Sequence, residues 1–555
     1  MARGASELVL WLSCSRLCNN EPRAVNTILD SPEVAKLVTL VEEAARSTEE
    51  GVKRFVEPAQ GTLRRATNKR QHMIFGRRGS GKSSLLRKAA ADLTVDRRPI
   101  AYVDLETFKA HSYPDVLLSV LISTFTEFEK WLRTAAIHPA HKVSFWQKLF
   151  GSKPNRPAFN RKDAEHLASQ LHGQIVELEK QLHSADDIAT TTSAKESSEV
   201  SSNSELGGTL GTRDVNVGAK LSGTERSGVA TETQEAYRRS KTDFLLRHIL
   251  DYQRLFRQLS ELSAGDSFLF LDDLYHIRRS DQPQVIDYFH RIAKGSNLWL
   301  KIGTIRHRTQ WYVHGDPPIG VKLGDDADEI DLDLTLEKYS LAKDFLTKVL
   351  RSFVSDCGDL TVSQILNEGA IDRLVLASGG VVRDFLAIFR RAVDVARERG
   401  EDHRGPKIGS EDVNVAAGEH ETSKREELKR DTLDDQKEIE KQFEQIVNFC
   451  VDGAKANLFL LDKSASGKEV ELVHELVDLR LIHLVRSRIT VSKRPGQIFE
   501  GYMLDVSQYT GSRKRHNFEL VNFWIPEKVE ELRRVKLIYE PGQGHQSFPS
   551  ATVSD

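Results

Sequence analysis

The feature that most limits the fold of this chain lies in residues 72–86, which read HMIFGRRGSGKSSLL. A short apolar run leads into a loop that fits the pattern G-x-x-x-x-G-K-[ST] through Gly76, Gly81, Lys82 and Ser83. Glycines at these positions let backbone N–H groups turn inward around phosphate oxygens, and the helix that begins near Lys82 adds the positive end of its dipole. The stretch therefore predicts a buried strand, a phosphate-binding loop and a helix in direct succession.

Three further apolar runs have the length and composition of buried parallel strands, with helical patterns between them. They are IAYVDL at 100–105, SFLFLDDL at 267–274 and LWLKIGTI at 298–305. This alternation indicates an α/β fold built on a parallel sheet. A chain of 555 residues is expected to hold more than one domain.

Two carboxylates, Asp272 and Asp273, end the third apolar run. The carboxyl end of a strand beside a phosphate-binding loop is where a carboxylate can hold Mg²⁺, and we assign this role to Asp272. Asp273 would then orient or deprotonate an attacking water as a general base. The alternative is that both carboxylates only cap the helix that follows.

The fourth run ends in the polar residues Thr304, Arg306 and Arg308. A polar group on a strand between the loop and the carboxylates can contact a γ-phosphate, which is the role expected of Thr304 or Arg306. Arg308 could instead reach the nucleotide of a neighbouring subunit as an arginine finger. Ordinary solvated surface arginines are the alternative.

A later segment, ASGGVVRDFLAIFRRA, places Gly379 and Gly380 at a helix start and Arg383 in its first turn. An arginine on a helical lid can swing onto a γ-phosphate and link nucleotide state to the lid angle. The alternative is a surface salt bridge.

The gap between the second and third expected strands is too long for a crossover, and residues 134–240 are assigned to an insertion. Within this gap, apolar positions recur every three or four residues at 164–182 and again at 245–259, which predicts the two arms of a helical hairpin. Residues 190–232 between them are rich in Ser, Thr and Gly, so a mobile, disordered tip is expected. The alternation of apolar and polar residues at 215–221 leaves a β-hairpin as the alternative.

The other divisions follow from changes in pattern along the chain. The expected parts are a helical lead-in at 1–60, the α/β core at 61–335, a helical lid at 336–418, a charged and solvent-exposed connecting helix at 419–445, a helix followed by two alternating strands at 446–527, and a tail at 528–555.

Composition narrows the classes of function. The 79 basic and 81 acidic side chains leave a net charge of −2, so any contact with nucleic acid or an anionic surface must be local. Four cysteines are too few and too scattered for a disulfide framework, which favours a reducing, cytoplasmic setting. No apolar run approaches the length of about 18 residues that a membrane span needs, so no membrane association is expected.

With these elements in order, the chain resembles the AAA+ ATPases, nearest to the clade that joins origin-recognition and initiator-type ATPases with STAND signalling ATPases. The resemblance rests on Walker A at 76–83, Walker B at 269–273, sensor 1 at 304–306 and sensor 2 at 379–383. It implies a P-loop NTPase core of five parallel strands, a helical lid, often a winged helix afterwards, and ATP and Mg²⁺ as cofactors.

The resemblance also implies roles for single residues. Asp273 stands where typical AAA+ members carry Glu, and Thr304 opens a sensor 1 that lacks the usual Asn, so both positions are closer to STAND ATPases and imply slow turnover. The implied nucleotide-binding residues are Gly76, Gly79, Ser80, Gly81, Lys82, Ser83, Ser84 and Thr304, the implied metal ligands are Ser83 and Asp272, and the implied catalytic residues are Lys82, Asp273, Arg306, Arg308 and Arg383.

The helix and two strands at 446–527 fit the winged helix that the resemblance implies. The exposed face of its helix at 468–479 is acidic, which phosphates would repel. Cations gather instead in the wing, where Arg488, Lys493 and Arg494 could contact DNA. A protein-docking or autoinhibitory module is the equally open alternative.

Together these features predict an ATP-binding and ATP-hydrolysing switch that couples nucleotide state to homo-oligomerisation and to DNA binding through a winged helix. The alternative is a STAND-like signalling or anti-phage defence scaffold that turns ATP over slowly and binds a protein partner through the 134–240 insertion.

Overall fold

The computed structural model describes residues 28–44, 54–95, 98–137, 160–202, 218–263, 265–399, 405–431, 436–510 and 518–541. The chain forms two compact units. The core unit comprises Ser47–Leu334 and Val470–Leu479, and the second unit comprises Met1–Arg46, Thr335–Glu469 and Arg480–Asp555.

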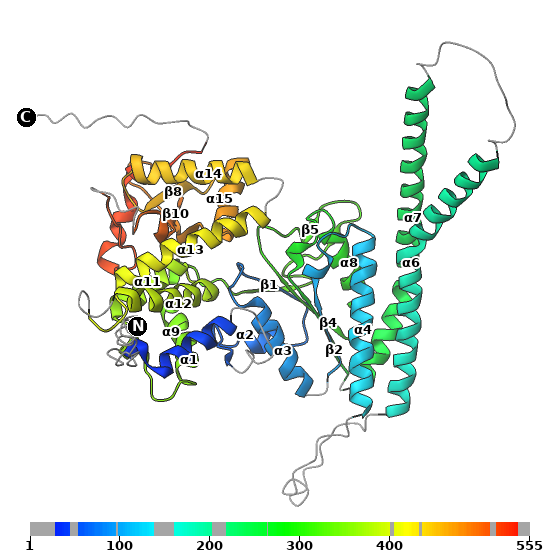
Figure 1. The fold of residues 1–555 in the computed structure, drawn as a ribbon, viewed down its shortest axis with the longest axis horizontal. Helices are drawn as coiled ribbons and strands as arrows, with labels where there is room; N and C mark the ends of the chain where they lie inside the picture. Colours follow the sequence, from blue (N-terminus) through cyan, green and yellow to red (C-terminus); the bar gives the residue numbers. More distant parts are fainter. Residues whose placement is uncertain are drawn as a thin grey trace, which may run out of the picture. The chain divides into compact units, whose positions relative to one another are not determined.

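A five-stranded parallel sheet forms the centre of the core unit, which confirms the predicted α/β fold (Figure 1). Its strand order is β2-β3-β4-β1-β7, so β4 lies between β1, which precedes the glycine-rich loop, and β3, which carries the carboxylates. That neighbourhood is the one expected from the sequence. The strands are β1 (His72–Phe75), β2 (Ile100–Asp104), β3 (Ser267–Asp272), β4 (Leu298–Thr304) and β7 (Asp328–Asp331).

Alternate side chains of β1 enter two separate hydrophobic clusters, because successive residues of a strand point to opposite faces. Met73 and Phe75 join a large cluster that helices α4, α6, α7 and α8 complete, whereas Ile74 packs with Leu85 and Leu86 of α3. The sheet is therefore covered on both faces. The helices are α2 (Thr62–Ala66), α3 (Lys82–Val95), α4 (Asp115–Ile137), α6 (Arg161–Ser202), α7 (Gly218–Glu261) and α8 (Gln282–Ala293).

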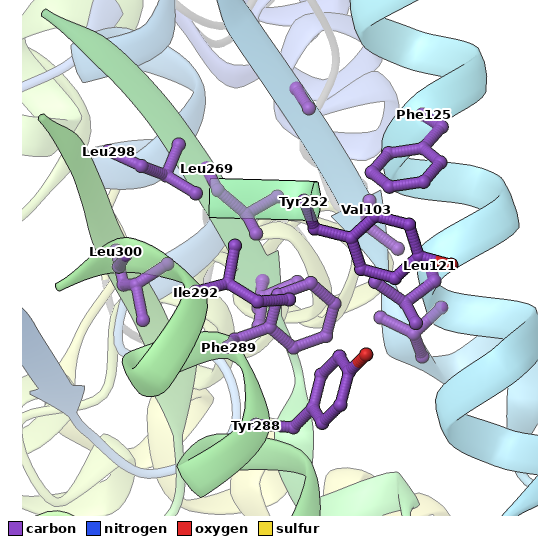
Figure 2. Close-up of a cluster of buried hydrophobic side chains, with 14 of the residues drawn as sticks. Val103, Leu121, Phe125, Tyr252, Leu269, Tyr288, Phe289, Ile292, Leu298 and Leu300 are labelled. Carbon is purple, nitrogen blue, oxygen red and sulfur yellow. The ribbon is translucent and has the colours of Figure 1, made fainter. Parts of the chain in front are cut away.

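Aromatic side chains hold the larger cluster together. Figure 2 shows Phe125 of α4 against Tyr252 of α7, with Phe289 of α8 turned toward both. The rings of Phe125 and Tyr252 meet edge to face with centroids 5.1 Å apart. This packing fixes the insertion helices to the sheet that carries the glycine-rich loop.

Helices α6 and α7 lie in the predicted insertion, and α6 packs along α4 (Figure 1). The helices reach further than composition indicated, because α6 continues to Ser202 and α7 begins at Gly218. Extending a packed helix needs no new nucleus, which explains helix in a polar sequence. The β-hairpin alternative is not adopted at 218–221, and 203–217 lies outside the described residues.

Smaller elements complete the core unit. The short hairpin β5 (Tyr312–Val313) and β6 (Ile319–Gly320) follows β4, and β6 lies against α8. The 3₁₀ turns η3 (Leu105–Phe108) and η4 (Leu274–His276) follow β2 and β3. Among the described residues, no helix is long and apolar enough to cross a membrane.

The second unit combines helices with a four-stranded sheet of order β11-β8-β10-β9. The predicted hairpin is present as β9 and β10, and its turn places Gly496 at φ 83°, in the left-handed region that glycine tolerates. The elements are α1 (Pro32–Glu43), α9 (Tyr339–Val354), α10 (Val362–Ile365), α11 (Glu368–Ser378), α12 (Val382–Arg399), α13 (Ser410–Asp431), α14 (Gln436–Asn448), β8 (Leu458–Asp462), β9 (Ile482–Ile489), β10 (Phe499–Leu504) and β11 (Ile538–Tyr539), while α15 (Lys468–Asp478) runs on into the core unit.

A buried ion cluster lies inside the second unit. Lys424 of α13 donates to Asp505 at 2.6 Å and lies 3.5 Å from Asp384 of α12, and all three side chains are at most 3% exposed. The sequence predicted a solvent-exposed helix at 419–445. That prediction is wrong at Lys424, which is buried. The cluster consists of Asp384, His420, Lys424, Arg480, His483 and Asp505.

Candidate phosphate- and metal-binding site

The glycine-rich loop closes tightly between β1 and α3. Gly79 and Gly81 have φ of 83° and 101°, which residues with a Cβ rarely adopt. A Cβ at Gly76 would lie 2.3 Å from Ser80 Oγ, so this position also excludes a side chain. The loop leads directly into Lys82, the first residue of α3, and the first N–H groups of an α-helix have no partner within the helix.

Two side chains of the loop have unusual surroundings. Lys82 is 4% exposed, and its Nζ donates to the carbonyl oxygens of Gly76 at 2.9 Å and Arg77 at 3.3 Å. Ser80 Oγ is buried and has no hydrogen-bond partner. A buried ammonium that donates to loop carbonyls and an unpaired buried hydroxyl both suit an anion with several acceptor oxygens.

Asp272 ends β3 next to the start of α3. Its carboxylate accepts hydrogen bonds from the Tyr102 hydroxyl and from the backbone N–H of Asp273 at 3.0 Å. Burial, together with the neighbouring charge of Asp273, raises the pKa of Asp272 above its ordinary value. The nearby Ser83 hydroxyl and Lys82 ammonium oppose this rise in the pKa of Asp272.

Asp273 adopts a left-handed conformation with φ 56° and ψ 46°. Aspartate tolerates this region better than most residues, although it is uncommon outside turns and functional sites. Asp273 precedes η4, but its side chain does not cap that turn. The alternative role of a helix cap is therefore not what the structure shows for this carboxylate.

The polar residues at the end of β4 have partners within the core unit. Thr304 is fully buried, and its hydroxyl lies 2.5 Å from that of Thr309, which donates to the carbonyl oxygen of Ile305 at 2.7 Å. Thr304 consequently donates to Thr309, and a phosphate would have to compete for that proton.

Arg306 turns toward the edge strand β7. Its guanidinium is paired with Glu329 and lies 3.4 Å from Asp331, and its Cζ is 4.2 Å from the centre of the Phe75 ring. These contacts fix Arg306 across the end of β1. A phosphate would have to displace Glu329 or Asp331 to bind the Arg306 guanidinium.

The structure gathers most of the predicted residues around one edge of the sheet. Gly76 to Ser84, Asp272, Asp273, Thr304, Arg306 and Arg308 all belong to the core unit. Arg383 lies near the start of α12 in the second unit.

Sequence reasoning missed Tyr102. This residue of β2 is in register with Phe270 of β3, two positions before Asp272, and the Arg87 guanidinium lies 4.7 Å from the centre of its ring. Burial and the Asp272 charge raise the pKa of Tyr102, so its hydroxyl remains a proton donor. A tyrosine inside the otherwise apolar run IAYVDL was the available signal.

This arrangement can hold a polyphosphate and a divalent cation. Oxygen ligands from Ser83 and Asp272 suit Mg²⁺, which prefers one or two protein oxygens with the rest supplied by phosphates and water. Among the described residues there is no group of three or more His, Cys, Asp or Glu side chains that could enclose a metal without such help.

Comparisons with known proteins add little to this geometry. No family model matches the sequence, and no curated protein matches it. Among solved structures, the chain is similar to the ORC1 protein of Aeropyrum pernix in complex with DNA, with a TM-score of 0.31, 13% identity, and coverage of 87% of this chain and 92% of that one. Neither the architecture nor the function of that protein is carried over to this chain at such a TM-score.

Proposed function

We propose that this chain is an ATP-dependent molecular switch that binds Mg²⁺-ATP in the loop at 76–84 and hydrolyses it slowly. The buried Lys82 ammonium within the glycine-rich loop, together with the buried Asp272 carboxylate at the end of β3, carries the proposal, because the two groups lie at the same edge of one parallel sheet. An anion-binding loop and a cation-binding carboxylate placed in this way suit a metal-bound triphosphate.

Each residue of the site has a role in this proposal. Lys82 exchanges its two loop carbonyls for phosphate oxygens, which gives the buried ammonium stronger, charge-assisted partners. Bound Mg²⁺ would neutralise phosphate charge between Ser83 and Asp272. Asp273 accepts the proton of the attacking water, and its shorter side chain relative to Glu accounts for slow turnover.

We expect Lys82→Ala to weaken ATP binding by about 100-fold, since about 3 kcal/mol of charge-assisted hydrogen bonding is lost. The measurement is titration calorimetry with ATP and Mg²⁺. Asp273→Asn should bind ATP as the wild type does but hydrolyse it about 10²–10⁴-fold more slowly. The control is Lys88→Ala on the same helix, where the lysine forms only a partly exposed pair with Asp92. Equal affinities for Lys82→Ala and Lys88→Ala would refute the nucleotide site.

DNA is the proposed partner of the β9–β10 hairpin. Arg488, Lys493 and Arg494 are all exposed, and Arg494 forms only an exposed pair with Glu540. We expect the triple alanine variant to lower the slope of log affinity against log salt by about 2–3, because three phosphate contacts disappear. Fluorescence anisotropy with a DNA duplex measures this. A variant with Lys343, Lys348 and Arg351 of α9 changed to alanine loses the same charge and should keep the wild-type slope.

Homo-oligomerisation in the ATP state belongs to the same proposal and can be measured as particle mass. The alternative function, a signalling or defence scaffold that binds a protein through the insertion, is supported by Val176, a large apolar side chain exposed on α6 within the insertion. Leu246 and Leu250 are exposed on α7 just beyond it. Such a scaffold would change mass with ATP while binding no DNA at low salt.

A further inference from the structure

Arg77, the first residue after Gly76, is hydrogen-bonded to Asp333, which follows the edge strand β7 of the core sheet. Arg77 donates its backbone N–H to both carboxylate oxygens of Asp333, at 2.9 and 3.1 Å, and its Nε to one of them at 3.2 Å. Arg77 is only 3% exposed and Asp333 22%. Three hydrogen bonds to one carboxylate make a geometrically specific link rather than an ordinary surface ion pair.

The carbonyl of the same residue faces the phosphate-binding side. Arg77 O accepts from Lys82 Nζ at 3.3 Å and from the backbone N–H of Ser80 at 3.1 Å. Arg77 therefore has Lys82 on one side and Asp333 on the other. When Lys82 turns to a phosphate, the Arg77 carbonyl loses the hydrogen bond from Lys82, while the three hydrogen bonds from Arg77 to Asp333 can remain.

Asp333 stands where the chain leaves the core unit. Leu332 makes the last ladder hydrogen bond from this segment to β1, through its N–H to Phe75 O at 2.9 Å. Asp333 donates its own N–H to Asp331 at 2.9 Å, and the core unit ends at Leu334, one residue later. The Arg77–Asp333 link is thus the last side-chain anchor before Thr335, the first residue of the second unit in this segment.

We propose that Asp333 is a positioning residue that transmits the state of the phosphate-binding loop to residues 334 and 335, one of the points at which the chain passes between the two units. The inference rests on the proposed ATP binding and adds the route by which bound nucleotide changes the second unit. A movement of the Arg77 peptide displaces Asp333, and the backbone torsions of 334 and 335 turn in response. ATP can shift the equilibrium between two conformations of the loop only by the difference in its affinity for them. The same difference limits how much bound ATP can change the angle between the units.

The same two strands supply a matched control. Arg70 precedes β1 and Asp328 begins β7, and they form an arginine–aspartate pair at 3.1 Å at the opposite end of the β1–β7 ladder. This pair is exposed and lies away from the loop. Asp328→Asn therefore removes the same kind of interaction between the same strands without touching the proposed route.

The test measures inter-unit distance and ATP affinity in the full chain. Fluorophores are attached at Ser280→Cys in the core unit and Ser355→Cys in the second unit, both exposed, with Cys14 and Cys18 changed to serine. Energy transfer is recorded without nucleotide, with ADP and with a non-hydrolysable ATP analogue, and affinity is measured by calorimetry.

We expect the wild type and Asp328→Asn to show the same nucleotide-dependent change in energy transfer. Asp333→Asn should lose more than half of that change while its ATP affinity stays within about fivefold, below the usual range of allosteric coupling. Arg77→Ala keeps both backbone hydrogen bonds to Asp333, so it should lose less of the change than Asp333→Asn.

The outcomes separate the inference from the function on which it rests. Absence of ATP binding in the wild type would end the proposed function itself. Wild-type binding with no change in energy transfer, a full change in Asp333→Asn, or an equal loss in Asp328→Asn would overturn the inference while ATP binding stands. Loss of ATP affinity in Asp333→Asn beyond fivefold would also overturn it, because Asp333 would then support the loop alone.

Discussion

Replacing Lys424 with methionine is expected to lower the free energy of unfolding of the second unit by about 3–5 kcal/mol, because it leaves buried carboxylates without their shared cation. Methionine keeps the apolar stem of the side chain and removes only the ammonium. Asp384 would retain Arg480, at 2.5 Å, whereas Asp505 would keep the neutral donors of Ser507 and the His483 ring at 3.3 Å but lose its ammonium partner. The measurement is urea unfolding of the wild type and the variant at neutral pH.

Two further variants make this expectation specific. Lys348→Met removes a lysine of the same unit that forms an exposed pair with Asp344, and it should cost less than about 0.5 kcal/mol. Adding Asp505→Asn to Lys424→Met should restore part of the loss, because the unpaired charge disappears while Oδ1 still accepts from the Ser507 N–H. A Lys424→Met cost equal to that of Lys348→Met would contradict the buried cluster.

The buried ion cluster also determines how the stability of the second unit depends on pH in acid. The Lys424 ammonium and Arg480 guanidinium hold the pKa of Asp384 well below its usual range, and Lys424 and His483 do the same for Asp505. Groups with lowered pKa stabilise the folded state above their ordinary value of 3.8, and this stability is lost as the pH falls further. Acid unfolding of this unit is therefore expected to begin below about pH 4.

Local patterns in the sequence predicted the strand, the glycine-rich loop and the helix at 72–86 correctly because the geometry of these elements is local. A short strand, a glycine-rich loop and a helix follow one another in 72–86, so no distant information was needed. The run FLFLDD likewise fixes the position of Asp272 at a strand end. The sequence analysis also placed the strand that ends at Thr304 between the glycine-rich loop and the carboxylates. The strand order confirms this, because β4 lies between β1 and β3.

The edge strand β7 was missed because it does not look like a buried strand. Its sequence DEID places three acidic residues around a single buried isoleucine, Ile330, and charged side chains of this kind suit an edge strand. The acidic side chains are nevertheless what hold Arg306. A pattern search for apolar runs cannot find a strand whose partners are a distant arginine and the backbone of β1.

Charge pairs between residues far apart in the sequence could not be predicted either, because a local pattern does not show which distant residue is the partner. Lys424 lies in a segment that composition marked as a solvent-exposed helix, and its partner Asp505 is 81 residues away. Lys301 sits in an apolar run as a fully buried amine, and its Nζ donates to the carbonyl oxygens of Asn68 and Arg70. The sequence shows the charges, but only the fold shows which of them lose contact with water.

The pH dependence of the core unit should run in the opposite direction, through Asp478 of α15. Its carboxyl group is 7% exposed, and one oxygen has no hydrogen-bond partner. Burial and the nearby Asp333 charge raise the pKa of Asp478 to about 7, although Arg308 and Arg77 oppose this. The folded state therefore binds this proton more tightly than the unfolded chain does.

Stability from this group is complete below the unfolded pKa of 3.8 and is lost as the pH rises to about 7, a loss of about 4 kcal/mol. Asp478→Asn should remove that slope and make the core unit more stable than the wild type at pH 8. Unfolding is followed by urea titration between pH 4 and pH 8. Glu471→Gln, an exposed acid of the same helix, is the control and should leave the profile unchanged. Parallel profiles for Asp478→Asn and the wild type would show that Asp478 stays ionised in the folded core, stabilised by Arg77 and Arg308.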